Sequence, residues 1–308
     1  MKINFPKVRQ LCVLFISAIF FVPAARAQKN GILPLTGMRF YNEGIAAKAI
    51  DVKIDGAQLL SNRIPLNKEI EISLKQATGF SADISKNMFA GAEVIVLSPR
   101  GEILMKNPNV FLKSYANGFT IKDLNAFNIK FGIGSELVKG NLSGLLKVRL
   151  FDMKGKSQLR LEIPVSFSKP GEALQVSKTA KPIRSDIGVN AMINGLEAKD
   201  LLVIVDTSIR VAPKMAYTSM NISNITGSSI SGIFEGKESF WVYDNDLNEV
   251  KITDILLKKV KGALENDLVD YTLKIPYRLK TNNTKTYFVR FRWESPDKKQ
   301  LIDVVVNI

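Results

Sequence analysis

Polar and apolar residues alternate along much of the chain, and a period of two is typical of a half-buried β-strand. The segments 69–74 and 158–167 both follow this pattern. In the second of them one face carries only apolar side chains: Leu159, Leu161, Ile163, Val165 and Phe167. The segment 93–97 is apolar after its first residue, which predicts a central strand buried on both faces.

Turn residues separate these segments and predict β-hairpins. Ser98-Pro-Arg-Gly101 carries proline and glycine at the second and fourth turn positions, and an apolar segment returns at 102–105. A turn at 152–156 joins the segments 146–150 and 158–167 in the same way. The second half repeats the plan with predicted strands at 239–243, 287–294 and 301–308 and turns at 244–248 and 295–299.

Three blocks of the first half recur in the second half at a nearly constant spacing. Phe89–Glu93 matches Phe234–Glu238, a shift of 145 positions (234 − 89), and Leu112-Lys113 matches Leu257-Lys258 at the same shift. The block 123–130 matches 267–274 at a shift of 144 (267 − 123), and Val148-Arg149 matches Val289-Arg290 at 141 (289 − 148). Solenoid units repeat at about 20–50 residues, so this longer spacing predicts a duplicated domain.

Many short strands with turns between them predict an all-β fold of two tandem antiparallel β-sandwich domains. A lead-in at 28–37 is expected before the first domain at 38–168, and the second domain is expected at 183–308. The segment 169–182 is rich in Pro, Gly, Ser and Lys and predicts the linker between them. The likeness to immunoglobulin-type modules is architectural and carries no functional residues across.

Each predicted domain also contains one segment that could form a short helix. Thr253-Asp254 could cap a helix over Ile255–Val260, where apolar residues lie near helical spacing. The counterpart is Asn109 followed by Val110 to Tyr115. Irregular strands are the alternative at both places.

The first 27 residues have the layout of a secretory signal peptide. Three basic residues precede an apolar run at 11–22, and Ala25-Arg26-Ala27 predicts cleavage before Gln28. The run is shorter than the ~20 residues that a membrane-spanning helix needs, so an uncleaved anchor is the weaker alternative. No later segment is apolar for long enough to cross a bilayer, and we expect an exported protein, periplasmic or extracellular.

Composition excludes several kinds of chemistry. The chain has no histidine, and its one cysteine, Cys12, lies within residues 1–27. Ser-His-Asp and thiol catalysis therefore have no residues to use, and zinc and copper sites, which draw on imidazole or thiolate, are not expected. Carboxylate, lysine or hydroxyl chemistry is all that remains.

Residues 28–308 carry a net charge of +10, since four of the 43 basic residues and none of the 29 acidic residues lie before them. The lysines are scattered, without interleaved aromatic residues, so nucleic acid is not an expected partner. A solvated basic surface is the favoured interpretation. Weak attraction to anionic glycans or lipopolysaccharide is the alternative.

One acidic cluster, Asp244-Asn-Asp246-Leu-Asn248, fits the first five positions of a calcium loop. Its sixth position is Glu249 instead of glycine and its twelfth is Ile255 instead of glutamate, so Asp244, Asp246 and Asn248 are a weak metal candidate and a plain β-turn is favoured.

The repeated motif Phe-x-Gly-x-Glu is interpreted as structural. Its phenylalanines, Phe89 and Phe234, are expected to be buried, and its glycines, Gly91 and Gly236, to allow a bulge or a close backbone approach. Glu93 and Glu238 could form a carboxylate pair for glycoside hydrolysis, but strand-edge surface acids explain them equally well.

Trp241 and Trp293 could stack on sugars, but both lie in apolar alternation that favours core packing. The predicted function is therefore an exported, non-enzymatic interaction or structural protein of the cell envelope, without a cofactor, that binds a protein or glycan. A carbohydrate-binding or carboxylate-dependent carbohydrate-active protein is one alternative. A periplasmic chaperone or assembly factor is the other, and oligomeric state is left open.

Overall fold

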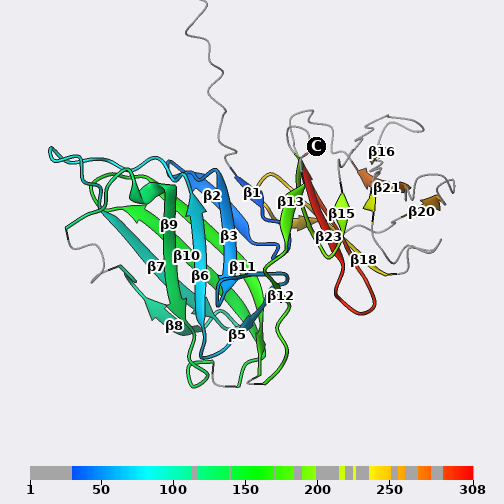
Figure 1. Ribbon diagram of the computed structural model, residues 1–308, viewed down its shortest axis with the longest axis horizontal. Helices are drawn as coiled ribbons and strands as arrows, with labels where there is room; N and C mark the ends of the chain where they lie inside the picture. Colours follow the sequence, from blue (N-terminus) through cyan, green and yellow to red (C-terminus); the bar gives the residue numbers. More distant parts are fainter. Residues whose placement is uncertain are drawn as a thin grey trace, which may run out of the picture.

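The computed structural model describes residues 30–111, 117–138, 140–169, 171–183, 189–198, 215–218, 225–226, 236–250, 256–260, 270–278 and 287–307. Within these residues the fold is all-β, with one short 3-10 helix, η1 (Asp123–Asn125). The strands form two units that lie side by side in Figure 1, an N-terminal unit (residues 30–177) and a C-terminal unit (residues 181–307). The predicted signal peptide, residues 1–27, lies outside the described part.

The first sheet of the N-terminal unit contains, in spatial order, β1 (Asn30–Ile32), β2 (Arg39–Glu43), β11 (Gln158–Ser168), β10 (Ser143–Asp152), β7 (Ala90–Leu97) and β8 (Ile103–Asn107). The neighbours in this order are antiparallel, and β5 (Arg63–Pro65) adds a parallel pair with β11. The hairpins predicted at 93–105 and 146–167 are confirmed as β7–β8 and β10–β11.

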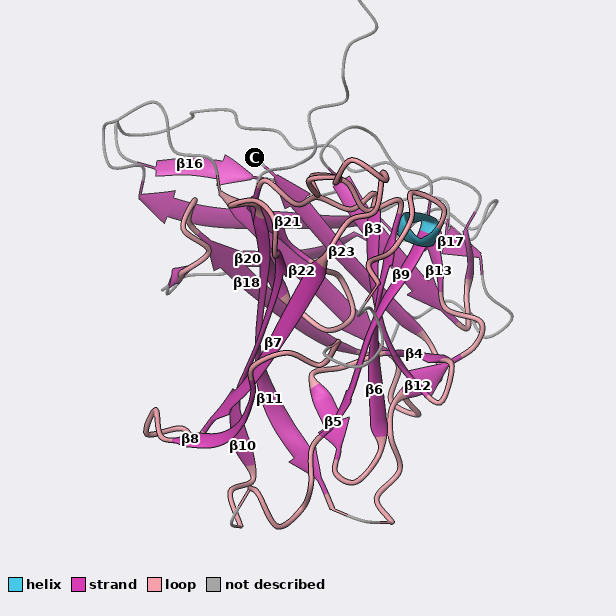
Figure 2. Cartoon of the chain, turned by 90° about the vertical axis from the view of Figure 1, so that its left-hand side faces the viewer, coloured by secondary structure: helices cyan, strands magenta, loops and turns pink. Residues whose placement is uncertain are grey.

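The second sheet of the N-terminal unit contains β12 (Val176–Ser177), β4 (Ala57–Leu59), β3 (Ala49–Ile54), β6 (Glu69–Lys75) and β9 (Ala126–Gly132), all antiparallel. Figure 2 shows the two sheets as facing layers, with β7, β10 and β11 in one and β6 and β9 in the other.

Apolar side chains at alternate positions of the strands fill the space between these layers. From the second sheet, Ile70, Ile72 and Leu74 of β6 point inward, and from the first sheet all five apolar residues predicted to share one face of β11 are buried. An aromatic cluster closes one end of the core, where Phe119 lies 5.1 Å from both Phe80 and Phe127 between ring centroids. One continuous core therefore holds the N-terminal unit together.

The carboxylate of Asp152 fastens the loops at the end of β10. It accepts hydrogen bonds from the backbone N–H groups of Ser81 (2.8 Å) and Lys154 (3.0 Å), and the side chain is buried. Burial acts to raise the pKa of Asp152, but the hydrogen bonds from Ser81, Lys154 and Gly155 outweigh it, and the pKa lies below its ordinary value of 3.8.

Asp152→Asn is expected to lower the free energy of unfolding by about 2 kcal/mol near neutral pH, because hydrogen bonds to a charged acceptor are lost. A depressed carboxyl pKa contributes stability above the unfolded value, and that contribution disappears as the pH falls below 3.8 toward the folded pKa. Urea unfolding at a series of pH values should therefore show the two proteins converging in acid. A difference that does not change with pH would contradict this role.

The main sheet of the C-terminal unit contains, in spatial order, β13 (Lys181–Ile183), β14 (Val189–Asn194), β23 (Leu301–Asn307), β22 (Phe288–Glu294), β18 (Lys237–Tyr243) and β19 (Glu249–Val250), all antiparallel. Two smaller sheets pair β15 (Glu197–Ala198) with β17 (Ile225–Thr226), and β21 (Asp270–Arg278) with both β16 (Met215–Thr218) and β20 (Leu256–Val260).

The main sheets of the two units have the same order of strands. In each sheet, a short strand and its neighbour come first, followed by the last strand of that sheet in chain order, the strand before it, and a hairpin from the middle of the unit. The blocks of similar sequence in the two halves agree with this strand order less closely. Glu93 lies opposite Arg149, whereas Glu238 lies opposite Trp293 and Arg290 opposite Trp241. The matches of Glu93 with Glu238 and of Arg149 with Arg290 therefore cannot both be equivalent positions.

The helical alternative at 255–260 is wrong for Leu256–Val260, which form β20 because they pair with β21 along their whole length. At the first counterpart, Val110 donates a backbone hydrogen bond to Ala92 of β7 (2.8 Å), so Val110 lies alongside that strand. Residues 112–116 and 251–255 lie outside the described part of the chain.

The segments predicted as lead-in and linker both contribute strands. Residues 30–32 form β1, and the turn that follows lies in the junction between the units. Within 169–182, β12 extends the second sheet of the N-terminal unit, and Lys181 begins β13 of the C-terminal unit.

Candidate functional site

The turn between β1 and β2 connects the two units. Leu33 donates a backbone hydrogen bond to Met38 (2.8 Å) and Gly37 donates one to Leu33 (3.0 Å), and Leu35 (φ 69°) and Gly37 (φ 72°) adopt left-handed backbone conformations. This shape buries the side chain of Leu35 against Leu60 of its own unit and Leu301 of the other. The turn therefore places a buried apolar side chain between the two units.

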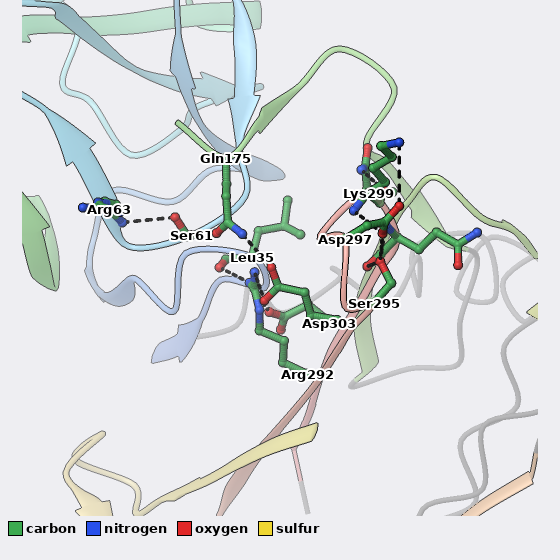
Figure 3. Close-up of polar contacts among 12 residues, drawn as sticks. Leu35, Ser61, Arg63, Gln175, Arg292, Ser295, Asp297, Lys299 and Asp303 are labelled. Atoms are coloured by element: carbon green, nitrogen blue, oxygen red, sulfur yellow. Dashed lines mark hydrogen bonds and ion pairs between the residues drawn. The ribbon is translucent and has the colours of Figure 1, made fainter. Parts of the chain in front are cut away.

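Two arginines and an aspartate of β22 and β23 meet the same turn. The guanidinium of Arg290 donates to both carboxylate oxygens of Asp303 (3.0 and 2.8 Å), and Arg292 donates to one of them (3.3 Å). Both arginines also donate to the backbone carbonyl of Leu35, each at 2.9 Å. Figure 3 shows Arg292 and Asp303 meeting at Leu35, apart from the turn that contains Ser295 and Asp297.

We name this group of residues the junction cluster (Leu35, Arg290, Arg292, Glu294 and Asp303). Its aspartate and its two arginines are almost completely shielded from solvent. Asp303 is 0% exposed, Arg290 6% and Arg292 8%. Burial acts to lower the pKa of Arg290, but the charge and hydrogen bonds of Asp303 outweigh it, so the pKa is raised and the guanidinium remains charged. The Glu294 carboxylate lies 3.6 Å from the Arg292 guanidinium. It also accepts a hydrogen bond from Gln175 of the N-terminal unit, which adds another polar contact between the units.

A second apolar contact lies beside the junction cluster. Ile32 of β1 packs against Leu247, Phe288 and Val305 of the C-terminal unit, and Leu247 is fully buried there. Arg39 donates a hydrogen bond to the carbonyl of Leu247 (3.3 Å). Apolar contacts and directional polar contacts together fix how the two units are oriented.

The predicted metal candidate lies in this contact as a β-turn. One carboxylate oxygen of Asp244 accepts hydrogen bonds from the backbone N–H groups of Asp246 and Asn248, both at 2.9 Å, and Leu247 adopts a left-handed φ of 60°. The turn therefore points Leu247 into the junction. No cluster of three or more Asp, Glu, His or Cys side chains capable of holding a metal occurs among the described residues.

The other residues singled out from the sequence lie apart from one another. Glu93 forms ion pairs with Arg149 (3.1 Å) and Lys106 (3.5 Å) of its own sheet, while Glu238 lies on β18 of the other unit. The ring of Phe151 lies against Gly91, where it leaves no room for a Cβ atom, and Trp293 does the same at Gly236. The predicted close backbone approach is present at Gly236, where the Glu294 carbonyl oxygen also lies close, whereas at Gly91 the close neighbour is the Phe151 side chain. Phe234 lies outside the described residues.

Neither tryptophan ring is fully exposed to solvent. Trp293 is 2% exposed, and Trp241 is partly buried with the guanidinium of Arg290 at 4.7 Å from its ring centre. Burial raises the pKa of the neighbouring Tyr243 hydroxyl, which also belongs to the contact with Ile32. The aromatic residues of β18 and β22 therefore serve packing between strands and units.

A groove of about 630 Å³ runs along the junction between the units. Leu33, Phe40 and Ile50 line it from the N-terminal unit, and Ile183 and Met192 from the C-terminal unit. Lys75 and Asp51, which also line the groove, form an ion pair (3.0 Å). A largely apolar lining with some polar groups is typical of binding sites between domains.

Sequence reasoning missed the junction cluster and the groove. The available signal was Asp303, a charge placed inside the apolar run 301–308, together with arginines at alternating positions of the preceding strand. Within the described residues no helix is long and apolar enough to cross a membrane. A comparison with models of known protein families gives no match, and a search among curated protein sequences finds no similar chain.

Proposed function

We propose that the chain is an exported, non-enzymatic interaction protein of the cell envelope, made of two tandem immunoglobulin-like β-sandwiches that arose by duplication. Its signal-peptide pattern supports export, and the common strand order of the two main sheets supports the duplication. Its lack of histidine, and of cysteine after Cys12, supports a binding role in place of catalysis.

The observation that carries the binding role is the groove between the units. Residues of both units line it, and the buried contacts of Leu35 and Leu247 hold the two walls in place, so the site is formed before a partner arrives. A preformed apolar groove suits an apolar segment of a protein better than a glycan. Glycan recognition would use exposed aromatic rings, whereas Trp241 and Trp293 are engaged in packing.

Ala49→Arg tests this proposal, because it places a charge on the groove wall contributed by β3. The tagged chain would be recovered from the cell-envelope fraction with its bound proteins. We expect the variant to retain about tenfold less partner than the unchanged chain, since an apolar segment would have to bury an unpaired charge. Ala82→Arg, at an exposed position outside the groove, is the matched control.

Equal partner recovery with Ala49→Arg and the unchanged chain would remove the groove as the binding site. A chain that brings down no protein from the envelope would remove the binding role itself. Urea unfolding midpoints of both variants must match that of the unchanged chain, so that a loss of folding is not mistaken for a loss of binding.

The groove also supports a periplasmic chaperone or assembly factor as a second candidate. Such a protein holds its client before assembly, so the bound segment should be one that is buried once the client is mature. Pulse-labelling separates the two candidates. A chaperone should release its partner as the partner matures, whereas a stable interaction protein should keep it.

A further inference from the structure

β3 has an open edge beside the groove. On one side it pairs with β6 along its whole length, but on the other side β4 pairs with it only at Lys53 and Ile54. Residues 49–52 of β3 therefore have no neighbouring strand on that side within the described part of the chain, and residues 49–51 line the groove. Figure 1 shows β3 on the side of the N-terminal unit that faces the C-terminal unit.

The hairpin between β3 and β4 assigns the backbone groups on this edge. Residues 55 and 56 form a two-residue turn with a positive φ at both positions (50° and 75°), so the flanking pair of Ile54 and Ala57 exchanges backbone hydrogen bonds. The backbone groups of a strand alternate in direction. Ile50 and Val52 therefore direct theirs to the same side as Ile54, away from β6.

The other end of β3 gives the same assignment. The N–H of Lys48 donates to the carbonyl of Lys75 on β6 (2.9 Å), and Ala49 lies opposite the same lysine, so Ala49 and Asp51 direct their groups toward β6. Ile50 thus presents both its N–H and its C=O on the open edge. No hydrogen bond to either group occurs among the described residues.

Apolar side chains surround these unpaired backbone groups. Phe40 of β2 and Ile50 itself line the groove and pack against the core of the N-terminal unit. Ile183 and Met192 line it from the C-terminal unit. The groove therefore combines a hydrogen-bonding strand edge with a largely apolar lining.

We propose that an extended segment of a partner protein, apolar at alternate positions, adds to β3 as a further strand of this sheet. The inference rests on the proposed function and states how the groove holds its partner. An extended backbone offers N–H and C=O groups at the spacing that Ile50 needs, whereas a helix uses its backbone groups internally. Alternate side chains of the segment would lie on the same side as Phe40 and extend the core.

Synthetic peptides test the mode of binding. Short overlapping peptides would cover the sequence of the protein recovered with the unchanged chain, and the probe is a peptide that binds this chain more tightly than Ala49→Arg. N-methylation at each residue of the probe removes one N–H at a time. Binding should weaken about tenfold at the residues that pair with β3 and stay unchanged at the residues between them. A series without this alternation overturns the proposal, as does a partner of which no peptide binds.

Ile50→Pro is the matching change in the chain. It removes the N–H on the open edge and leaves the hydrogen bonds of β3 with β6 in place, since prolines are tolerated at strand positions whose N–H faces outward. The probe should bind about tenfold more weakly to Ile50→Pro, whereas Ile50→Val, which keeps the N–H, should bind within about twofold of the unchanged chain. Urea unfolding midpoints show whether Ile50→Pro folds.

Amide hydrogen exchange, followed by NMR, decides the question without a variant. In the purified chain the amide of Ile50 should exchange at least about tenfold faster than those of Asp51 and Lys53, which are bonded to β6, and the bound probe should remove the difference. A slow Ile50 amide in the chain alone would mean that the chain itself or a second copy fills the edge, which overturns the proposal.

The two proposals fail separately. Unchanged partner recovery with Ala49→Arg removes the groove, and with it the proposed function. Weakened binding by Ala49→Arg, together with an unprotected Ile50 amide in the complex, removes strand addition alone.

Discussion

Asp303→Ala is expected to lower the free energy of unfolding by about 3–5 kcal/mol, the largest loss we expect from a single side chain of the junction. Asp303 is fully buried and accepts hydrogen bonds from Arg290 and Arg292. Removing it leaves two buried guanidinium groups that share the Leu35 carbonyl as an acceptor, with the Glu294 carboxylate 3.6 Å from Arg292. Urea unfolding measures the loss directly.

Glu69→Ala is the control for this prediction, because it removes an ion pair with Lys130 whose side chains are 58% and 51% exposed. An exposed pair of this kind should cost no more than about 1 kcal/mol. Replacing the charged side chains together (Arg290→Met, Arg292→Met and Asp303→Leu) should restore much of the stability lost by Asp303→Ala, because no buried charge is then left uncompensated. If Asp303→Ala costs no more than Glu69→Ala, the junction cluster does not hold the units together.

The strands and their hairpins could be predicted because side-chain alternation is a local property of the sequence. The face of β11 from Leu159 to Phe167 is an example, since each of its apolar residues points into the core as the period of two requires. The same reasoning separates the two faces of β22 correctly, with Arg290, Arg292 and Glu294 on one side. Local pattern therefore determines which residues share a face.

What covers that face could not be predicted, because alternation does not distinguish solvent from a second unit. The arginines of β22 are buried only because a turn more than 250 positions earlier in the chain supplies the Leu35 carbonyl. The acidic turn at Asp244 is a similar case. Its spacing suggested a metal ligand set, but its position is explained by Leu247, an apolar residue whose partners, Ile32 among them, lie far away in sequence. Contacts of this range need the fold before they can be inferred.

Gly37→Ala is expected to cost about 3 kcal/mol and to separate the turn from the junction cluster, for two reasons that can be measured apart. Gly37 has a φ of 72°, which costs an L-residue about 1 kcal/mol. A Cβ atom there would also overlap the Arg290 guanidinium, which cannot move without losing Asp303 or Leu35. Overpacking of this kind adds about 1–3 kcal/mol.

Gly56→Ala isolates the backbone cost. Gly56 has nearly the same φ, 75°, but a Cβ atom there would contact nothing within 4 Å. Urea unfolding should therefore give a loss of about 1 kcal/mol for Gly56→Ala, leaving the remainder of the Gly37→Ala loss to the overlap. Tryptophan emission gives an independent readout, because the Arg290 guanidinium lies over the ring of Trp241. Only Gly37→Ala should displace Arg290, so only that variant should shift the emission. The contrary outcome is an equal loss of unfolding free energy for the two variants, with unchanged emission. The turn would then tolerate displacement from Arg290, and the orientation of the units would depend on the apolar contacts of Leu35 and Leu247 alone.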